Sequence, residues 1–130
     1  MKKIERKILD VIKKWYLACG TDRIFFKKIN EKEKISGLEN MLKYYYKDKA
    51  IFTIDLKENE LKIEWEDYAN KTYISRINML IKTFYEKYDC VYINEDKKVV
   101  YFDAEAGYDK HLCGVMVKGK EYIKKAIREA

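Results

Sequence analysis

The sequence predicts an α+β fold, in which a helical N-terminal part precedes an antiparallel sheet of four to five strands with helices packed on one face. Apolar residues recur at helical spacing near both ends and in the middle of the chain. Residues 50–67 and 90–103 each read instead as two strands around a polar turn. The 130 residues suffice for one domain with a real core. We expect a single domain over 1–130, with a basic helical part (1–49) and a hairpin–helix–hairpin–strand–helix part (50–130).

The first helix is expected over residues 2–18. Its apolar residues recur at spacings of four and three and therefore share one face, while basic residues cover most of the other face. The apolar set is Ile4, Ile8, Ile12, Trp15 and Cys19. We expect Gly20 to end this helix, because glycine readily adopts the left-handed conformation found at helix C-termini.

Two shorter helices are expected to complete the N-terminal part. Residues 22–30 hold a compact apolar group, and residues 35–47 carry another stripe at helical spacing. The first group is Ile24, Phe25, Phe26 and Ile29, and the second is Ile35, Leu38, Met41, Leu42 and Tyr45. Three consecutive tyrosines, residues 44–46, would span about 200° of a helix. At least one of them should therefore be exposed.

The first hairpin, residues 50–67, is expected to turn at Glu58-Asn59. This register gives the apolar pairs Leu56/Leu61, Ile54/Ile63 and Phe52/Trp65 on one face, and Asp55/Lys62 and Thr53/Glu64 on the other. One face is then buried and the other wet, as in a typical antiparallel sheet. A long helix over residues 69–88 should follow, with the stripe Ile74, Ile77, Ile81, Phe84 and Tyr88.

The second hairpin, residues 90–103, is expected to turn at Asp96-Lys97. Its pairs would be Val91/Phe102 and Ile93/Val100, with Cys90 opposite Asp103. Both faces are fairly apolar, so this hairpin should lie deeper in the sheet than the first. A fifth strand is expected at His111–Val117. The final helix would turn its apolar residues inward, namely Tyr122, Ile123, Ala126 and Ile127.

Charge is distributed unevenly along the chain. The net charge is +6, and residues 1–49 carry 14 Lys/Arg against 7 Asp/Glu, whereas residues 50–130 carry 14 against 15. Such polarity favours an electrostatically steered partner, with solvated helix faces as the alternative explanation. The excess of Lys over Arg argues against dense bidentate recognition of phosphate or guanine. Abundant Lys, Ile, Tyr and Glu is typical of a low-GC bacterium, its phage or a mobile element.

The chain is expected to act in a reducing compartment, the cytoplasm of a bacterial host cell. Its first residues carry charges every few positions, unlike a signal peptide, and no apolar run reaches the length of a membrane span. The 3 cysteines follow no disulfide framework.

A zinc site is one candidate for chemistry. His111 and Cys113 would lie on the same face of a strand. Cys90 and Asp103 would lie opposite each other in the second hairpin, also on a shared face. Together these four residues would give a tetrahedral set of N, S and O ligands. Cys19 could replace Asp103. The alternative is a buried strand, in which Cys113 belongs to the core and His111 lies at the strand's end.

Catalysis is poorly supported by the sequence, and we expect no enzyme. Asp55 with Glu60 and Lys62 superficially matches the carboxylates and lysine of metal-dependent nucleases, but Asp55 and Lys62 are better explained as an ion pair across the hairpin. The chain has 1 histidine and 5 glycines, and it contains no glycine-rich phosphate loop.

A winged-helix DNA-binding regulator is a further alternative. Three helices followed by a hairpin have the required order, and the basic N-terminal third would attract a phosphate backbone. The recognition helix, residues 35–47, would present Ser36, Asn40, Lys43, Tyr44 and Lys47. It lacks arginine, however, and the tip of the hairpin carries two glutamates where phosphates would lie.

The sequence therefore favours a small non-enzymatic binding protein that acts through a charge-polarised surface. Its partner is expected to be a protein or ribonucleoprotein, as for phage or mobile-element inhibitors of host machinery such as anti-CRISPR proteins. DNA binding and a small zinc-binding module are the alternatives. The expected partner-binding residues are Lys13, Lys14, Lys27, Lys28, Lys43, Tyr44 and Lys47.

Overall fold

The computed structural model describes residues 2–18, 24–64, 70–110, 114–117 and 120–129. The helices are α1 (Lys3–Leu17), α2 (Lys71–Phe84) and α3 (Lys120–Glu129). The strands are β1 (Ile24–Lys28), β2 (Glu33–Leu38), β3 (Met41–Tyr46), β4 (Lys49–Asp55), β5 (Glu60–Ile63), β6 (Cys90–Ile93), β7 (Val99–Asp103), β8 (Tyr108–Lys110) and β9 (Gly114–Val117).

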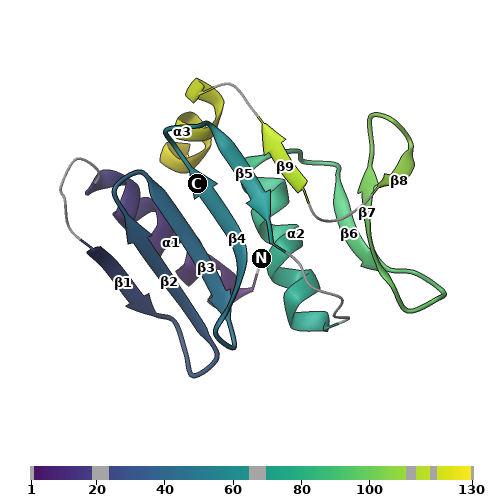
Figure 1. Ribbon diagram of the computed structural model, residues 1–130, viewed down its shortest axis with the longest axis horizontal. Helices are drawn as coiled ribbons and strands as arrows, with labels where there is room; N and C mark the ends of the chain where they lie inside the picture. Colours follow the sequence, from purple (N-terminus) through teal and green to yellow (C-terminus); the bar gives the residue numbers. More distant parts are fainter. Residues whose placement is uncertain (1, 19–23, 65–69, 111–113, 118–119, 130) are drawn as a thin grey trace.

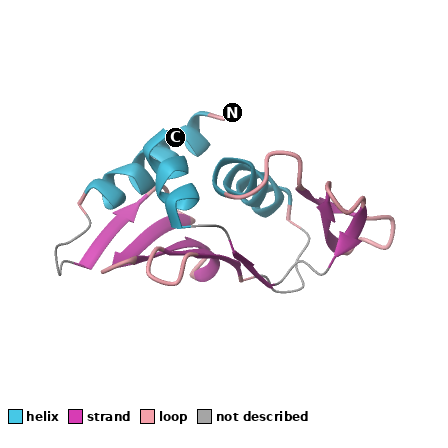
Figure 2. Cartoon of the chain, turned by 90° about the horizontal axis from the view of Figure 1, so that it is seen from above, coloured by secondary structure: helices cyan, strands magenta, loops and turns pink. Residues whose placement is uncertain are grey.

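Two antiparallel sheets carry these strands. The large sheet has the order β1-β2-β3-β4-β5-β9, and the small sheet has the order β6-β7-β8 (Figure 1). The three helices lie on one side of the large sheet, and the small sheet lies beyond α2 (Figure 2). The predicted α+β class, with an N-terminal helix and helices on one face of an antiparallel sheet, is confirmed.

The core lies between the helices and the inner face of the large sheet. α1 buries Ile8, Ile12 and Trp15, as its apolar stripe predicts, and α2 buries Ile77, Ile81 and Phe84. α3 adds Ile123 and Ile127, and the sheet supplies Ile35, Leu42, Phe52, Ile54, Leu61 and Ile63. In the part of the chain that the structure describes, no helix is both long and apolar enough to cross a membrane.

The two short helices predicted for residues 22–30 and 35–47 are wrong, because this region forms the strands β1, β2 and β3. In β3 the buried residues are Leu42, Tyr44 and Tyr46, which alternate with more exposed ones as in a strand with one covered face. Lys47 and Asp48 both have positive φ, 49° and 66°, and join β3 to β4 as in a type I′ hairpin turn. The tyrosines and isoleucines fit a pleated, half-buried surface.

The β4–β5 hairpin is confirmed, with a register two residues away from the predicted one. Phe52 pairs with Ile63 and Ile54 with Leu61. An even shift keeps every side chain on its predicted face, but Thr53, which was expected on the wet face, is only 6% exposed. The predicted partner Trp65 lies outside the described residues. The turn is longer than expected, because the pairing stops at Asp55 and Glu60 and leaves residues 56–59 between the strands. Leu56 in this turn is buried, and its amide donates to the Asn40 carbonyl oxygen at 2.9 Å.

The β6–β7 hairpin also exists, but its register differs by one residue and it does not join the large sheet. Cys90 pairs with Phe102 and Val91 with Tyr101. The turn is a loop over 94–98, in which the Asn94 amide donates to the Lys98 carbonyl oxygen at 2.9 Å. The predicted deeper position in the same sheet is wrong. The fifth strand joins the large sheet as β9 beside β5, and its predicted residues 111–113 lie outside the described part.

Gly37 allows α1 to approach the large sheet closely. A Cβ atom on Gly37 would lie 2.7 Å from Cδ1 and 2.7 Å from Nε1 of Trp15, closer than real Cβ contacts come. Trp15 is 3% exposed, so the indole has little room to move away. Gly37 pairs with Phe25 of β1, and Trp15 therefore supports the sheet close to its outer strand.

Asn70 caps the N-terminus of α2. Its Oδ1 accepts hydrogen bonds from the amides of Thr72 at 2.8 Å and Tyr73 at 3.3 Å. These are two of the donors that the first turn of a helix leaves without an intrahelical partner.

We expect Asn70→Ala to lower the free energy of unfolding by about 1 kcal/mol, the usual cost of losing a cap. Asn70→Asp should retain most of the stability, because aspartate is an equally good cap. Urea unfolding followed by far-UV circular dichroism measures both. Equal losses in the two variants would contradict a capping role.

Candidate functional site

The candidate site is the open face of the large sheet, opposite the helices. Four large apolar side chains on it are exposed, namely Ile24 by 78%, Phe26 by 59%, Leu38 by 53% and Met41 by 40%. Ile24, Leu38 and Met41 follow one another in a cross-strand row, and Phe26 is two residues along β1 on the same face. These four residues form the apolar patch. Adjacent exposed apolar side chains within polar surroundings are typical of a protein-binding surface.

Lysines surround the apolar patch on the same face. They are Lys28 on β1, Lys34 on β2, Lys43 on β3 and Lys62 on β5. The Lys34 ammonium lies 2.8 Å from the Asp48 carboxylate, and the Lys28 ammonium lies 3.3 Å from that of Glu31. Both acidic partners are largely exposed, and such pairs contribute little. These lysines can therefore exchange their present partners for the carboxylates of another molecule.

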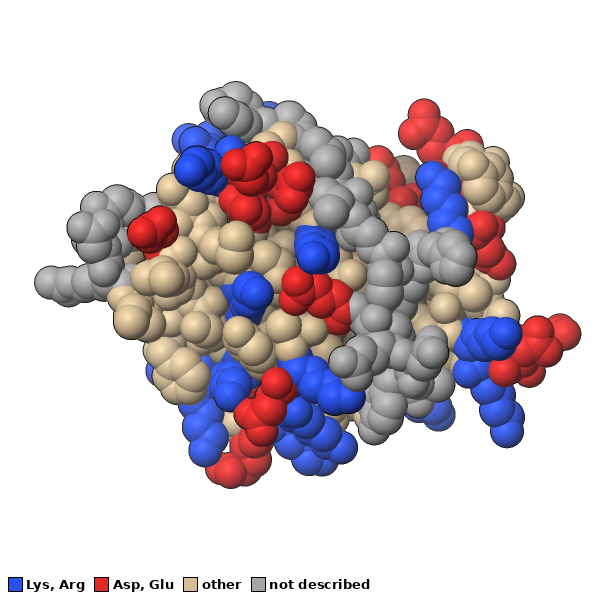
Figure 3. All heavy atoms as spheres, viewed as in Figure 1, with Lys and Arg blue, Asp and Glu red and all other residues tan. Residues whose placement is uncertain are grey.

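Acidic residues lie toward the other side of this face. Asp55 of β4 pairs with Glu60 of β5, and Glu64 follows β5. Figure 3 looks onto the open face and shows uncharged atoms with basic and acidic side chains next to one another among them. Lys28, Lys34 and Lys43 thus lie with the apolar patch on β1–β3, while Asp55 beside Met41, Glu60 and Glu64 lie on the β4–β5 side together with Lys62. A partner would meet this surface in one preferred orientation.

Thr53 lies near the centre of the open face, between Lys43 and Lys62 of the neighbouring strands. The residue is 6% exposed, and its Oγ1 has no hydrogen-bond partner within the described part of the chain. A buried hydroxyl without a partner costs free energy. Because this oxygen is covered by the protein itself, a molecule docked on the face would not reach it in this conformation.

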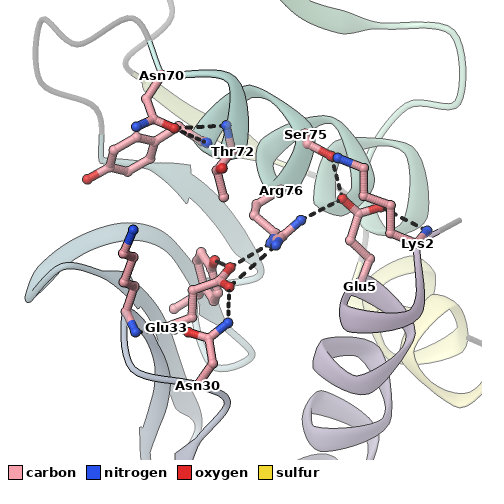
Figure 4. Close-up of polar contacts among 11 residues, drawn as sticks. Lys2, Glu5, Asn30, Glu33, Asn70, Thr72, Ser75 and Arg76 are labelled. Carbon is pink, nitrogen blue, oxygen red and sulfur yellow. Dashed lines mark hydrogen bonds and ion pairs between the residues drawn. The ribbon is translucent and has the colours of Figure 1, made fainter.

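A buried polar network on the inner face of the sheet fixes the strands that present this surface (Figure 4). Arg76 of α2 lies between two carboxylates. Its Nε donates to Glu33 of β2 at 2.5 Å, and its Nη1 donates to Glu5 of α1 at 3.0 Å. Tyr44 donates its hydroxyl to Glu33, and Ser75 donates to Glu5 at 2.5 Å.

The protonation states of the network match its hydrogen bonds, with charged acceptors facing donors. Burial raises the pKa of Glu33, but hydrogen bonds from Arg76, Tyr44 and Asn30 outweigh it and hold the pKa below its ordinary value of 4.5. Burial raises the pKa of Tyr44 above its ordinary value, and the hydrogen bond to Glu33 raises it further. Glu33 is thus a carboxylate at neutral pH and Tyr44 a neutral donor. Because these donors and acceptors satisfy one another, we interpret the network as structural.

The predicted partner-binding residues are divided among three places. Lys28 and Lys43 lie on the open face, and Lys27 lies at the outer strand β1 with its side chain toward the helix side of the sheet. Lys14 is exposed and Lys13 half-buried on α1, across the sheet from the patch (Figure 2). Lys47 is exposed in the turn after β3. They do not form one continuous surface.

Tyr44 was predicted to contact a partner, and this prediction is wrong. The residue is 1% exposed, because it points from β3 into the core, where it meets Glu33. The recognition helix of the winged-helix alternative is also missing, since residues 35–38 and 41–46 are strands. The predicted helix therefore cannot enter a major groove.

The predicted zinc ligands are only partly described. Cys90 pairs with Phe102 rather than with Asp103, and the one-residue difference in register places Cys90 and Asp103 on opposite faces of the small sheet. Asp103 instead pairs with Lys110 and accepts from the Ala106 amide at 3.0 Å. Neither Cys19 nor the pair His111 and Cys113 lies within the described residues. Those residues contain no group of three or more His, Cys, Asp or Glu that could hold a metal.

The apolar patch and the Arg76 network were missed from the sequence. The signal for the patch was the alternation of residues 24–28 and 33–46, which was interpreted as helical. The signal for the network was Arg76 itself, a single arginine within the apolar stripe of a helix between Ile74 and Ile77. Comparisons of this chain with protein-family models, with curated proteins and with solved structures found no match.

Proposed function

We propose that this protein is a non-enzymatic binding protein whose open sheet face docks on a protein or ribonucleoprotein. The observation that carries the proposal is the apolar patch, four large side chains exposed by 40–78% on adjacent strands. Burying such side chains in an interface contributes roughly 25 cal/mol for each Å² removed from water. The lysines beside the patch supply the polar rim that binding surfaces need.

A protein partner fits this face better than nucleic acid does. The patch is built mainly from aliphatic side chains, whereas single-stranded nucleic acids bind on aromatic side chains that stack with bases. Asp55, Glu60 and Glu64 on the same face would repel a phosphate backbone. An inhibitor of host machinery, the role suggested by the composition, would use such a surface to cover a site on its target.

The double variant Leu38→Ser/Met41→Ser should test this proposal. We expect it to bind the partner roughly 100-fold more weakly, because two apolar anchors worth about 1.4 kcal/mol each are lost. The wild-type chain and the variant are immobilised, used to capture proteins from bacterial lysate, and compared by quantitative mass spectrometry and then by titration calorimetry on the captured protein.

The matched control is Tyr92→Ser/Ile93→Ser, which removes two side chains of comparable exposure, 38% and 37%, from the small sheet. This control should retain binding. Capture that is equal for all three proteins, or salt-dependent binding to duplex DNA in a gel shift, would contradict the proposal.

A further inference from the structure

The outer edge of β1 is a second feature of the same surface. β1 lies at the end of the large sheet and pairs only with β2 among the described strands. Four of its five residues are exposed, the exception being half-buried Phe25. An edge strand presents backbone N–H and C=O groups that can pair with another strand.

The side chains of β1 indicate what such a strand would be. Ile24 and Phe26 continue the apolar patch to the edge, while Lys27 and Lys28 make the C-terminal end of the strand basic. Within the described part of the chain, the one ion pair of these two lysines joins Lys28 to Glu31, whose side chain is 91% exposed. The edge therefore offers apolar positions at one end and positive charge at the other, with no acidic residue among its five.

Charge argues against a second copy of this chain as the occupant. Two β1 strands pairing edge to edge would bring four lysines into one short ladder without a carboxylate, in molecules that each carry a net charge of +6. Like charges at neighbouring positions of a ladder are destabilising. A strand with acidic residues at one end matches the same edge favourably.

We infer that the outer edge of β1 binds an extended acidic segment of a partner protein by strand addition. This inference rests on the proposed function and names the manner of docking. The backbone of the added strand pairs with β1, its apolar side chains extend the patch beside Phe26, and its carboxylates contact Lys27 and Lys28. Main-chain hydrogen bonds provide the affinity, and alternate side chains provide the specificity.

Synthetic peptides test the inference even while the natural partner is unidentified. The probe is a nine-residue peptide with valine at alternate positions and acidic residues toward one end. One control peptide has lysines in place of the acids, and a second has alternate backbone amides N-methylated so that they cannot donate. We expect the acidic peptide to shift the NMR amide signals of residues 24–28, with roughly tenfold weaker binding for the lysine peptide and none for the N-methylated peptide.

The charge-reversal variant Lys27→Glu/Lys28→Glu sharpens this test. It should invert the preference, so that the lysine peptide binds more tightly than the acidic one. Unchanged preference, shifts confined to residues outside β1, absence of shifts at millimolar peptide, or a dimer formed through β1 in light scattering would each overturn strand addition.

The same variants distinguish failure of this inference from failure of the proposed function. Against a protein captured by the wild-type chain, loss of binding in Leu38→Ser/Met41→Ser together with full binding in Lys27→Glu/Lys28→Glu would retain the open face and reject the β1 edge. Full binding in both variants would reject the open face itself.

Discussion

Replacing Arg76 with methionine is expected to lower the free energy of unfolding by about 3–5 kcal/mol at neutral pH, the range for breaking a buried ion pair. Methionine fills a similar volume but leaves the carboxylates of Glu5 and Glu33 buried without their shared cation. Both residues are at most 6% exposed, so water cannot replace the lost partner. Urea unfolding followed by tryptophan fluorescence measures the loss.

The loss should depend on pH in a defined direction. In the wild type the folded-state pKa of Glu33 is below 4.5, so its contribution is present above that pH and is lost as the pH falls through the folded-state pKa. In Arg76→Met the burial that raises this pKa and the hydrogen bonds from Tyr44 and Asn30 that lower it remain, while the hydrogen bond and charge of Arg76 are gone. The pKa of Glu33 should then be higher than in the wild type, so Glu33 contributes less stability at neutral pH in the variant. The difference between the two proteins should therefore shrink between neutral pH and about pH 4.

Two controls accompany the Arg76 prediction. Lys82→Met removes an exposed cation from the same helix and should change stability by less than about 0.5 kcal/mol. The triple variant Glu5→Gln/Glu33→Gln/Arg76→Met removes all three charges and should recover a large part of the loss. If the triple variant is no more stable than Arg76→Met, uncompensated charge is not the cause.

Trp15→Ala is expected to cost about 3–5 kcal/mol, the usual range for truncating a buried tryptophan. The indole is 3% exposed and fills the space between α1 and Gly37 of β2. The effect should be read by far-UV circular dichroism in urea, because the substitution removes one of the 2 tryptophans. The neighbouring exposed residue provides the control, and Lys14→Ala should change stability by less than about 0.5 kcal/mol.

Gly37 shows whether the close contact itself accounts for this effect. Gly37→Ala in the wild type should cost about 1–3 kcal/mol, because the new methyl group overlaps the indole. In the Trp15→Ala background the same methyl group enters vacated space, so its penalty should disappear. Additive losses in this double-mutant cycle would contradict direct contact between the two positions.

The sequence was most informative where one spacing dominates a segment. α1, α2 and α3 each have a single apolar stripe, and that stripe predicted Ile8, Ile77 and Ile127 as core residues, as observed. In the β4–β5 hairpin the alternation was strong enough that an error of two residues in register left every side chain on its correct face. For such elements, the spacing of apolar residues is enough to predict both the secondary structure and the buried face.

Residues 24–46 were misassigned because two periods coexist there. Ile35, Leu38 and Leu42 fit a helix, whereas the residues that are buried, such as Ile35, Leu42 and Tyr44, belong to alternating strands joined by a short turn. The turns also carry weak signals. Glu39 and Lys47 both have positive φ in these turns. Glycine or asparagine is the common choice for this conformation, so glutamate and lysine gave no sign of a turn.

Of the candidate site, only the lysines Lys28 and Lys43 were predicted from the sequence, and the apolar patch was not. The apolar patch exists only when β1, β2 and β3 lie side by side, so an interpretation of these residues as helices hides it. The Arg76 network joins residues that are 43 and 71 positions apart in the chain. Local periodicity carries no information about such distant pairs.

These separations have a consequence for folding during synthesis. A ribosome adds about 5–20 residues per second, so Glu5 is made roughly 4–14 s before Arg76, which lies 71 residues later. Until Arg76 is synthesised, Glu5 and Glu33 lack the guanidinium group that they share in the folded protein. Burying their carboxylates before then would cost free energy, so we expect both to stay in contact with water. The nascent N-terminal half should therefore keep α1 undocked from its strands. The protein can close its core in one late cooperative step, once residue 76 and the strand at 114–117 have both left the ribosome.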